Sequence, residues 1–396
     1  MSVWHPTELE LRDAGSLKWT GLTTADGQKT MGAWVAEMDF ATAPPVEDAL
    51  ISSIKKGLLG YPPRWADEES VDAMVSFLER RTGWVVKPGW ARSHSSVLGA
   101  LHTTIDELTQ PGSAVVVPTP NYMPFLTIPG GHGRELIEVP SLHTPNATDP
   151  REAWSLNLEG IEEVLAGGAG LLILCNPWNP TGRVLSVPEL EELNQVVNKY
   201  DALIFSDEIH APLVYEDPSS MVSYASLGDA YSHNTVTAVA ASKAWNVAGL
   251  PASQVIIPNN ELRERWDRAH PREHATTLGS VAAIAAYTNG DEWLAEVVET
   301  IDANVRLLEE ALRDTAVDYT RPQGTYLNWL GFEAYDLDRT PQKVLLDDYA
   351  VATNDGISLG TGYEHWVRVN AAMSRRPWEE TVGRIADFAN KAPLKQ

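Results

Sequence analysis

Short apolar segments alternate with helical patterns through the middle of the chain, and this alternation restricts the fold more than any other feature. The apolar segments are four to six residues long and lie at 114–117, 135–139, 171–175, 202–206, 235–240 and 254–257. Continuous apolar strands separated by helices are typical of a mostly parallel sheet that is covered on both faces. The sequence therefore predicts an α/β fold in which ligands bind at the carboxyl ends of the strands.

The pattern changes near residue 280. One or two long helices are predicted across 281–311, with a possible break at Asn289-Gly290. Strand-like segments at 326–330 and 366–370 then lie between helical patterns, which is typical of an α+β domain. The first 45 residues read as an irregular arm. The expected division has three parts: an N-terminal arm at 1–45 that contributes to the small domain, a large α/β domain at 46–285, and a small α+β domain at 286–396.

The chain has 396 residues, of which 54 are acidic and 30 basic, and its net charge of −24 argues against binding to nucleic acid or to anionic membranes. Its single cysteine, Cys175, excludes an intramolecular disulfide and fits a reducing compartment. The N-terminus does not read as a signal peptide, and no apolar run approaches the ~20 residues of a membrane span. No His or Cys cluster with metal-ligand spacing and no phosphate-binding glycine loop is present. We expect a cytoplasmic protein without a metal site.

Lys243 directly follows the predicted strand at 235–240. A buried ammonium without a partner is unfavourable, so a lysine at this position needs either a partner or a chemical role. A lysine whose pKa is lowered by its surroundings can form a Schiff base with a carbonyl cofactor. The alternative is a strand-end lysine whose head reaches solvent.

Two further motifs follow neighbouring predicted strands. The segment 171–175 runs into Asn176-Pro177 and then Asn179-Pro180, which form a rigid loop from which Asn179 could donate to a ligand oxygen. A plain turn is the alternative. The segment 202–206 runs into Asp207, and a buried aspartate facing a pyridine nitrogen would keep such a ring cationic. Helix capping by Asp207 is the alternative.

Arg368 lies between apolar residues of a predicted strand, so its side chain is expected to point inward. The planar guanidinium matches a carboxylate with two parallel hydrogen bonds, as a substrate carboxylate would require. A buried structural salt bridge is the competing interpretation.

These motifs, NPWNPTG at 176–182, SDEIH at 206–210 and SKAWNVAG at 242–249, followed by an arginine near the C-terminus, resemble the fold-type I pyridoxal-phosphate (PLP) enzymes of the class I/II aminotransferase superfamily. Details of one branch, the MalY/PatB-type cystathionine β-lyases, also match, and they lie at 18–19, 34–40, 60–62, 80–84, 121–125, 207–210 and 323–326. Aminotransferases usually carry Tyr where this chain has His210, and many carry a phosphate-binding Arg where it has Pro251. Both differences favour the lyase branch.

The resemblance implies a mostly parallel seven-stranded sheet in a large domain plus a smaller α+β domain, and it implies PLP as cofactor. It also implies roles for the catalytic residues. Lys243 would bear the cofactor and move the substrate α-proton, and Asp207 would pair with the pyridine nitrogen. Tyr61 would reach the phosphate of the neighbouring subunit's cofactor, which implies a homodimer with shared active sites. Arg368 would bind the substrate α-carboxylate.

The remaining implied contacts concern the cofactor ring and phosphate. Asn179 would donate to the ring O3′, Tyr122 would stack on the ring, and His210 would lie near it. The phosphate would be held by Ser242, Ser96 and Val97, at a predicted helix start that favours an anion. The family usually has a glycine-containing turn where this chain reads SHSSV at 93–97, so the details of phosphate binding stay open. Two interpretations stay open for His270 and His274: they contact the substrate, or they are solvated surface residues.

The predicted function is α,β-elimination of cystathionine or a related cysteine S-conjugate to a thiol, pyruvate and ammonia. The first alternative is a PLP-dependent aminotransferase, which shares the early steps and acts on an amino acid and a 2-keto acid. The second is a non-catalytic, regulatory PLP-binding protein. The set of Lys243, Asp207 and Arg368 argues against the second, because a pocket used only for binding has no need of the lysine.

Overall fold

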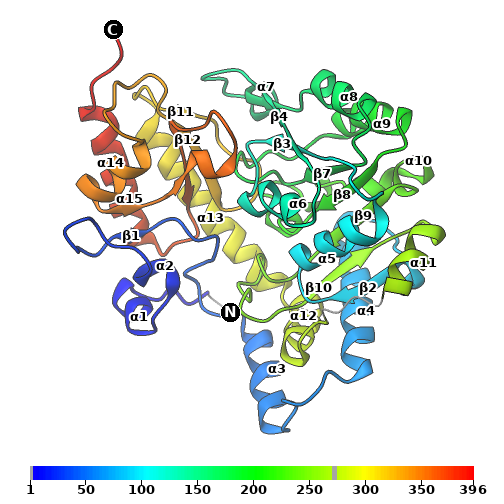
Figure 1. Cartoon of the computed structure of the whole chain (residues 1–396). Coiled ribbons are helices and arrows are strands. Elements are labelled where there is room, and N and C mark those ends of the chain that lie inside the picture. The colour runs from blue at the N-terminus through cyan, green and yellow to red at the C-terminus, as the bar shows by residue number, and fades with distance from the viewer. Residues whose placement is uncertain (1–2, 270–273) are drawn as a thin grey trace.

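A computed structural model describes residues 3–269 and 274–396 (Figure 1). Its largest sheet has seven strands in the order β2-β10-β9-β8-β7-β3-β4. Their bounds are β2 Ala91–His94, β3 Val115–Thr119, β4 Leu136–Pro140, β7 Leu171–Cys175, β8 Leu203–Asp207, β9 Thr235–Val239 and β10 Ser253–Ile256. Within this sheet β10 runs antiparallel to both neighbours, and the pairs among β9, β8, β7, β3 and β4 are parallel. The predicted seven-stranded, mostly parallel α/β sheet is confirmed.

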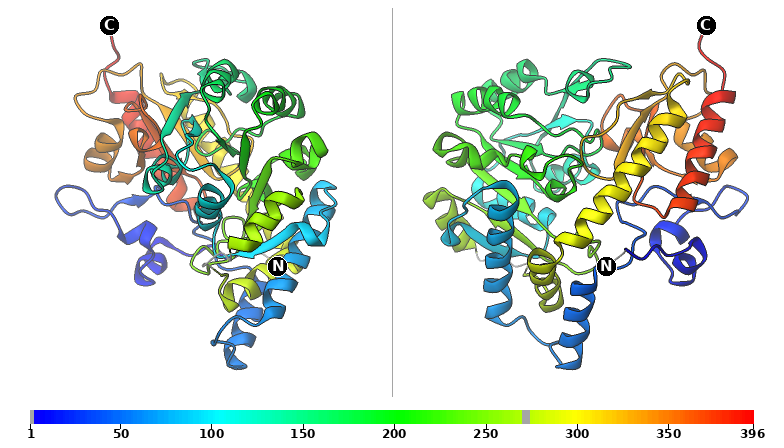
Figure 2. Two further views of the ribbon diagram at one scale, coloured as in Figure 1. Left: turned by 45° about the vertical axis from the view of Figure 1, so that its right-hand side comes forward. Right: turned by 180° about the vertical axis from the view of Figure 1, so that it is seen from behind.

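The central strands are mostly apolar because helices cover both faces of the sheet. Every residue of β3, β7, β8 and β9 is buried. One core cluster joins these strands to helices of the same part of the chain, whose bounds are α5 Val97–Thr103, its π-helical continuation η2 Thr104–Leu108, α8 Leu158–Ala166, α9 Val187–Lys199 and α11 Asn260–Ala269. A helical hairpin, α3 Pro44–Lys55 and α4 Arg64–Thr82, packs on α12 Thr277–Asn289 and projects from the molecule (Figures 1 and 2).

A second, four-stranded sheet is antiparallel and has the order β11-β12-β15-β14. Its strands are β11 Asp318–Tyr319, β12 Leu327–Gly331, β14 Asn354–Asp355 and β15 Trp366–Asn370, and its helices are α13 Asp291–Leu312, α14 Pro341–Tyr349 and α15 Arg375–Lys391. The predicted break between the two long helices is present at Gly290, where an added Cβ would collide with the Trp245 side chain.

The arm is not irregular throughout, so that expectation is wrong. It contains α1 Glu8–Asp13, α2 Leu17–Thr20 and β1 Met31–Gly32. Thr7 and Glu10 form a capping box at the start of α1, a T-x-x-E signature that is readable in the sequence. β1 pairs in parallel with β13 Val351–Ala352, which favours the predicted contribution of the arm to the small domain. The division at residues 45 and 285 itself stays a prediction.

The remaining described elements are short and connect those above. They are η1 Pro88–Trp90, η3 Met123–Leu126, α6 Ile128–Gly131, β5 Leu142–His143, α7 Pro150–Ala153, β6 Trp154–Ser155, η4 Ala211–Leu213, η5 Pro218–Ser220, η6 Tyr224–Leu227, α10 Asp229–Ser232 and η7 Gly356–Leu359. None of the helices in the described part of the chain is long and apolar enough to cross a membrane.

Candidate active site

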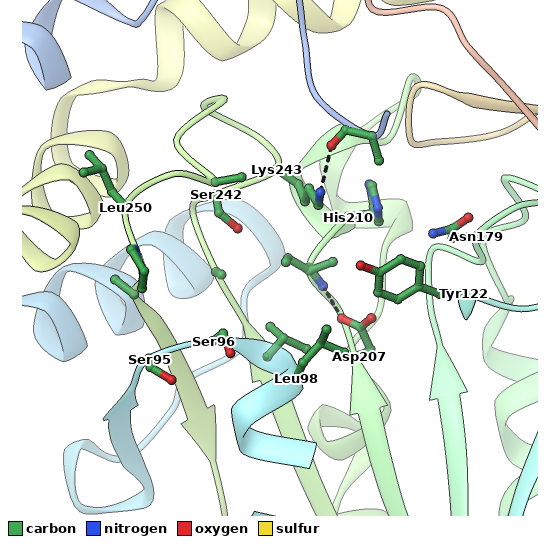
Figure 3. Close-up of a pocket in the computed structure, with 17 residues that line it drawn as sticks. Ser95, Ser96, Leu98, Tyr122, Asn179, Asp207, His210, Ser242, Lys243 and Leu250 are labelled. Carbon is green, nitrogen blue, oxygen red and sulfur yellow. Dashed lines mark hydrogen bonds between the residues drawn. The ribbon is translucent and has the colours of Figure 1, made fainter. Parts of the chain in front are cut away.

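A cavity of about 240 Å³ opens at the carboxyl ends of the parallel strands (Figure 3). Its polar wall comes from segments that follow five different strands, and the arm closes one side. The polar lining residues are Ser95 and Ser96 after β2, Tyr122 after β3, Asn179 after β7, Asp207 and His210 at the end of β8, and Ser242 and Lys243 after β9. The sheet topology therefore brings together residues that are more than 140 positions apart in the sequence, at the edge where open α/β sheets bind ligands.

Lys243 lines this cavity, and its ammonium donates to the carbonyl oxygen of Ala36 in the arm at 2.7 Å. No carboxylate of the described residues lies within ion-pair distance of its Nζ. Burial, together with the charge of Arg368, lowers the pKa of Lys243 to about 8, and Asp207 opposes this shift. An amine with this pKa is roughly one-tenth unprotonated at pH 7, far more than at the ordinary lysine value, and a nucleophilic lysine requires the unprotonated form.

Asp207 ends the neighbouring strand β8, and β8 pairs directly with β9, the strand that precedes Lys243. One carboxylate oxygen accepts the backbone N–H of Ile209 at 3.1 Å, and the other has no hydrogen-bond partner among the described residues (Figure 3). Burial raises the pKa of Asp207 to about 7. A cationic N–H facing the second oxygen would offset this cost, because a nearby positive charge favours the ionised carboxylate.

Arg368 contacts Asn179, which lines the cavity, but Arg368 is not itself one of the lining residues. A terminal nitrogen of Arg368 donates to the Asn179 Oδ1 at 3.1 Å, and this bond leaves the Asn179 Nδ2 as a donor toward the cavity. The Asn179 loop is held in place by its neighbours, because the backbone N–H of Leu185 donates to the Asn176 Oδ1 at 3.0 Å. The alternative for Asp207, helix capping, is not observed in the described residues, because its bond to Ile209 closes a local turn and the next helix, η4, has His210 as its N-cap.

Arg368 is 2% exposed, yet no carboxylate among the described residues forms an ion pair with it. Its other partners are the Asn354 Oδ1 at 2.6 Å, the Trp34 carbonyl oxygen at 3.4 Å and the Met123 Sδ at 4.0 Å, and its buried Nε has no partner among the described residues. Burial lowers the pKa of Arg368 to about 10. A structural salt bridge, the competing interpretation, is absent from the described residues. A buried arginine without a counter-ion fits a site that receives an anion.

His210 and Tyr122 flank Lys243 and Asp207 across the cavity. Burial and the charges of Lys243 and Arg368 lower the pKa of His210 to about 3, so the ring is neutral near pH 7. Its Nδ1 is buried without a partner, and the ring contacts Tyr326 edge to face at 5.6 Å. The hydroxyl of Tyr122 points into the cavity, and the Tyr122 ring lies beside Asp207.

The predicted phosphate-binding residues lie at the opposite end of the cavity. Ser96 is the N-cap of α5, and its side chain accepts the backbone N–H of Gly99 at 2.9 Å. Val97 begins this helix, and Ser242 faces it from the loop after β9. Backbone N–H groups at a helix start favour an anion.

Other predicted residues lie elsewhere. Tyr61 is fully exposed, in the turn between α3 and α4, and does not line the cavity of its own chain. His274 is exposed, and His270 lies outside the described residues. Within residues 3–269 and 274–396, no group of His, Cys, Asp and Glu side chains could hold a metal ion.

Two contributors were missed at the sequence level. The carbonyl oxygen of Ala36 accepts both the Lys243 Nζ at 2.7 Å and the Tyr326 hydroxyl at 2.9 Å. Ala36 and Tyr326 belong to two segments that carried the family resemblance, WVAEMDF and QGTY. The role of Ala36 was not predictable, because a backbone oxygen leaves no side-chain pattern in the sequence.

The family profile described as "Aminotransferase class I and II" matches residues 33–385. The chain belongs to this family. Within the family it is similar to a cystathionine β-lyase of Corynebacterium glutamicum, with 35% identity over 95% of this chain and 97% of that protein. It is also similar to the cystathionine β-lyase PatB of Bacillus subtilis, with 32% identity over 93% of this chain and 95% of the relative.

A solved structure extends this likeness to the fold. The crystal structure described as a putative PLP-dependent β-cystathionase from Corynebacterium diphtheriae superposes with a TM-score of 0.88 at 32% identity, covering 98% of this chain and 99% of that one. The predicted superfamily, its lyase branch and the fold-type I architecture are confirmed.

Proposed function

We propose that this protein is a PLP-dependent carbon–sulfur β-lyase that converts cystathionine or a related cysteine S-conjugate, with water, to a thiol, pyruvate and ammonia. One observation carries the proposal. Lys243 and Asp207 stand at the ends of two paired strands and face one cavity, and the buried Arg368, which has no counter-ion among the described residues, contacts Asn179 in the cavity wall. The names of the relatives at 30% identity or more support lyase chemistry and PLP, so the predictions of an enzyme, of its reaction and of its cofactor are confirmed.

The residues present fit the cofactor. Asp207 has a carboxylate oxygen without a partner for the pyridine nitrogen, and Asn179 has an amide nitrogen for the ring O3′. Tyr122 would lie against the ring face, with His210 close to it. Ser242 and the start of α5, at Ser96 and Val97, would hold the phosphate. When bound, PLP supplies an electron sink that stabilises negative charge at the substrate Cα.

Residues of the chain bind the substrate and move its proton. Arg368 binds the substrate carboxylate and thereby directs the Cα–H bond toward Lys243. The Lys243 amine, with its pKa lowered to about 8, takes the Cα proton as a general base. As that proton leaves, the Cβ–S bond breaks and the sulfur departs as a thiolate. His210 stays neutral and acts as a partner of the ring rather than as a base.

Homodimerisation belongs to the same proposal. The α3–α4 hairpin exposes a group of apolar side chains, namely Ile51, Ile54, Leu59, Tyr61 and Trp65. Exposed apolar patches of this kind mark interfaces, and a symmetric dimer is the commonest way to cover one. In such a dimer Tyr61 would reach the phosphate of the neighbouring subunit's cofactor. A cytoplasmic location is also part of the proposal and rests on the single, buried Cys175.

Product analysis tests the reaction. Purified, PLP-loaded protein is incubated with cystathionine, without any added keto acid. A lyase releases pyruvate, ammonia and homocysteine in equal amounts. Strict dependence on an added keto acid would assign the protein to the transaminases, and a protein that holds PLP without any turnover would be the regulatory alternative.

Subunit exchange tests the shared site. Tyr61→Phe and Lys243→Ala homodimers are mixed, because one site of each hybrid dimer then holds both native groups. Partial recovery of pyruvate release is expected. If mass spectrometry shows that hybrids form and activity stays absent, the shared-site proposal is wrong.

A further inference from the structure

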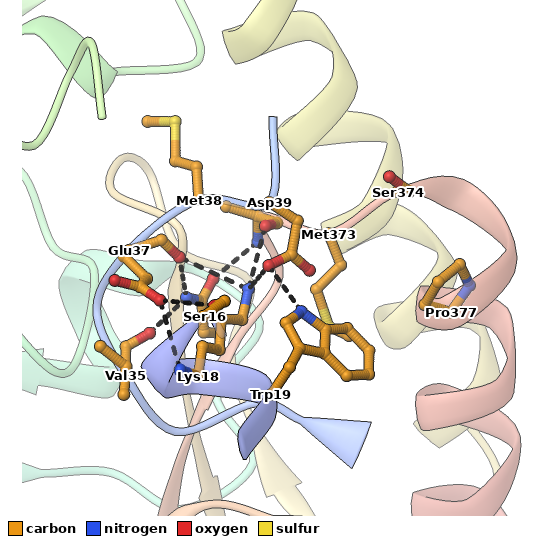
Figure 4. Close-up of polar contacts among 12 residues, drawn as sticks. Ser16, Lys18, Trp19, Val35, Glu37, Met38, Asp39, Met373, Ser374 and Pro377 are labelled. Atoms are coloured by element: carbon orange, nitrogen blue, oxygen red, sulfur yellow. Dashed lines mark hydrogen bonds and ion pairs between the residues drawn. The ribbon is translucent and has the colours of Figure 1, made fainter. Parts of the chain in front are cut away.

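A buried ion pair lies in the arm, outside the cavity (Figure 4). The Lys18 Nζ and the Asp39 Oδ1 are 3.0 Å apart, and their side chains are 0% and 1% exposed. The indole N–H of Trp19 donates to the same Asp39 oxygen at 2.9 Å, and the Lys18 Nζ also donates to the carbonyl oxygen of Ala372 at 3.2 Å. Two charges are thus fully desolvated at a place where apolar side chains would serve stability as well or better. This arrangement calls for an explanation beyond stability.

Lys18 contacts both flanks of Ala36. On one flank its carbonyl oxygen accepts the Trp34 indole N–H at 3.1 Å. On the other flank its backbone N–H donates to the Glu37 Oε1 at 3.3 Å, and its Nζ reaches the Glu37 carbonyl oxygen at 3.4 Å as well as Asp39. The approach is so close that a Cβ at Gly32 would collide with the Lys18 backbone.

The same short segment is also held by Asn370 at the end of β15 and by Asn246 in the connection between β9 and β10. The Asn370 Nδ2 donates to the carbonyl oxygens of Val35 and Glu37, both at 2.6 Å. Asn246, three residues after Lys243, pairs with the backbone of Met38, accepting its N–H and donating to its carbonyl oxygen, both at 2.9 Å. Between these anchors the Ala36 carbonyl oxygen is left to face Lys243 and Tyr326.

We propose that Lys18 and Asp39 are positioning residues of the active site, whose ion pair fixes the arm so that the Ala36 carbonyl holds the free amine of Lys243. The proposal rests on the proposed role of Lys243 as the lysine that moves the Cα proton. During turnover that amine is released into the cavity, and it needs a fixed acceptor to stay aligned with the Cα–H bond. A misplacement of about 1 Å at such a step can cost on the order of a hundredfold in rate.

The test uses the double variant Lys18→Met/Asp39→Asn, which removes both charges, keeps the side-chain volumes and retains an acceptor for the Trp19 indole. The first readout is the rate at which an amine-specific acylating reagent modifies Lys243 in cofactor-free protein, followed by peptide mass spectrometry. Loss of one hydrogen bond to Nζ predicts labelling about fivefold faster than in the wild type. This measurement does not depend on which reaction the loaded enzyme catalyses, whereas failure of the proposed function would appear as absence of pyruvate from the wild type.

The second readout is the isotope effect on kcat with cystathionine deuterated at Cα. A misaligned Lys243 slows proton transfer, so kcat should fall about tenfold, the isotope effect should rise and KM should change little. Leu190→Ala is the matched control, because it opens a cavity in the core under α9 and lowers stability without touching the arm. Labelling and isotope effect at wild-type values in the folded double variant would overturn the proposal. If the double variant does not fold, the same two readouts are taken on Asp39→Asn alone, and wild-type values there would overturn the proposal equally.

Discussion

Lys18 and Lys243 both contact residues 34–39 of the arm, and they show two opposite uses of a buried ammonium. Lys18 is fully buried against Asp39, and burial lowers its pKa while the carboxylate opposes the shift. Lys243 borders a cavity and, among the described residues, has only the Ala36 carbonyl as a hydrogen-bond partner, and its pKa falls to about 8. The paired lysine holds backbone in place through its contacts with Asp39, Glu37 and Ala372. The lysine without a counter-ion is available as a nucleophile and base.

The largest expected effect separates these two roles. Lys243→Ala should abolish the yellow colour of the PLP-loaded protein and reduce kcat by about 10³-fold or more, because it removes the residue proposed as both attachment point and base. The melting temperature should change little, since no carboxylate loses its partner. Lys18→Met should lower the melting temperature. The free energy of unfolding should fall by about 3–5 kcal/mol, because Asp39 stays buried without its partner. Lys199→Ala, at an exposed lysine on α9, serves as the control that changes neither.

The next effect concerns the anion site beside Lys243. Arg368→Lys should lower kcat/KM for amino-acid substrates by about tenfold to a hundredfold, because an ammonium cannot form the bidentate pair. The cofactor absorbance should persist, since the partner we propose for Arg368 is the substrate carboxylate rather than the cofactor. Steady-state kinetics and a thermal melt are run on one preparation. Arg321→Lys, at an arginine that does have a carboxylate partner in Asp302, should leave the kinetics normal. Normal kinetics with a lowered melting temperature in Arg368→Lys would contradict the proposal that Arg368 binds the substrate carboxylate.

Parts of the candidate site were predictable from the sequence, and other parts were not. The common location of Asp207, Asn179 and Lys243 at one edge of the sheet was predictable, because each stands at the end of a short apolar strand and parallel strands end at one edge. Their roles stay predictions. The break at Gly290 was predictable for a similarly local reason. The Ala36 contact was not predictable, because it joins a backbone oxygen to a side chain 207 positions away. The partners of Arg368 were equally hidden, since an inward arginine suggests a carboxylate whereas the structure gives it Asn179 and Asn354.

The smallest expected effect concerns Asp207 in the absence of cofactor. Its folded-state pKa of about 7 exceeds its ordinary value of 3.8, so the folded protein binds more protons between these two values. Stability should therefore fall as pH rises from about 4 to 7, and Asp207→Asn should recover about 1–3 kcal/mol at pH 8 in chemical denaturation of cofactor-free protein. Glu208, with its pKa raised to about 7 by burial, contributes to the same window. Glu208→Gln should flatten the profile further without weakening PLP binding, whereas Asp207→Asn should weaken it. Equal PLP affinity in both variants would contradict the pairing of Asp207 with the cofactor.

The contrast between the two lysines can be read directly by mapping where the cofactor attaches. PLP-loaded protein is reduced with borohydride, which fixes the cofactor to its lysine, and the digested protein is analysed by mass spectrometry. The phosphopyridoxyl group should be found on Lys243, in amounts approaching one per chain, and Lys18 should be unmodified. A phosphopyridoxyl group on Lys18 or on an exposed lysine, with Lys243 unmodified, would contradict the assignment of Lys243 as the cofactor-bearing residue.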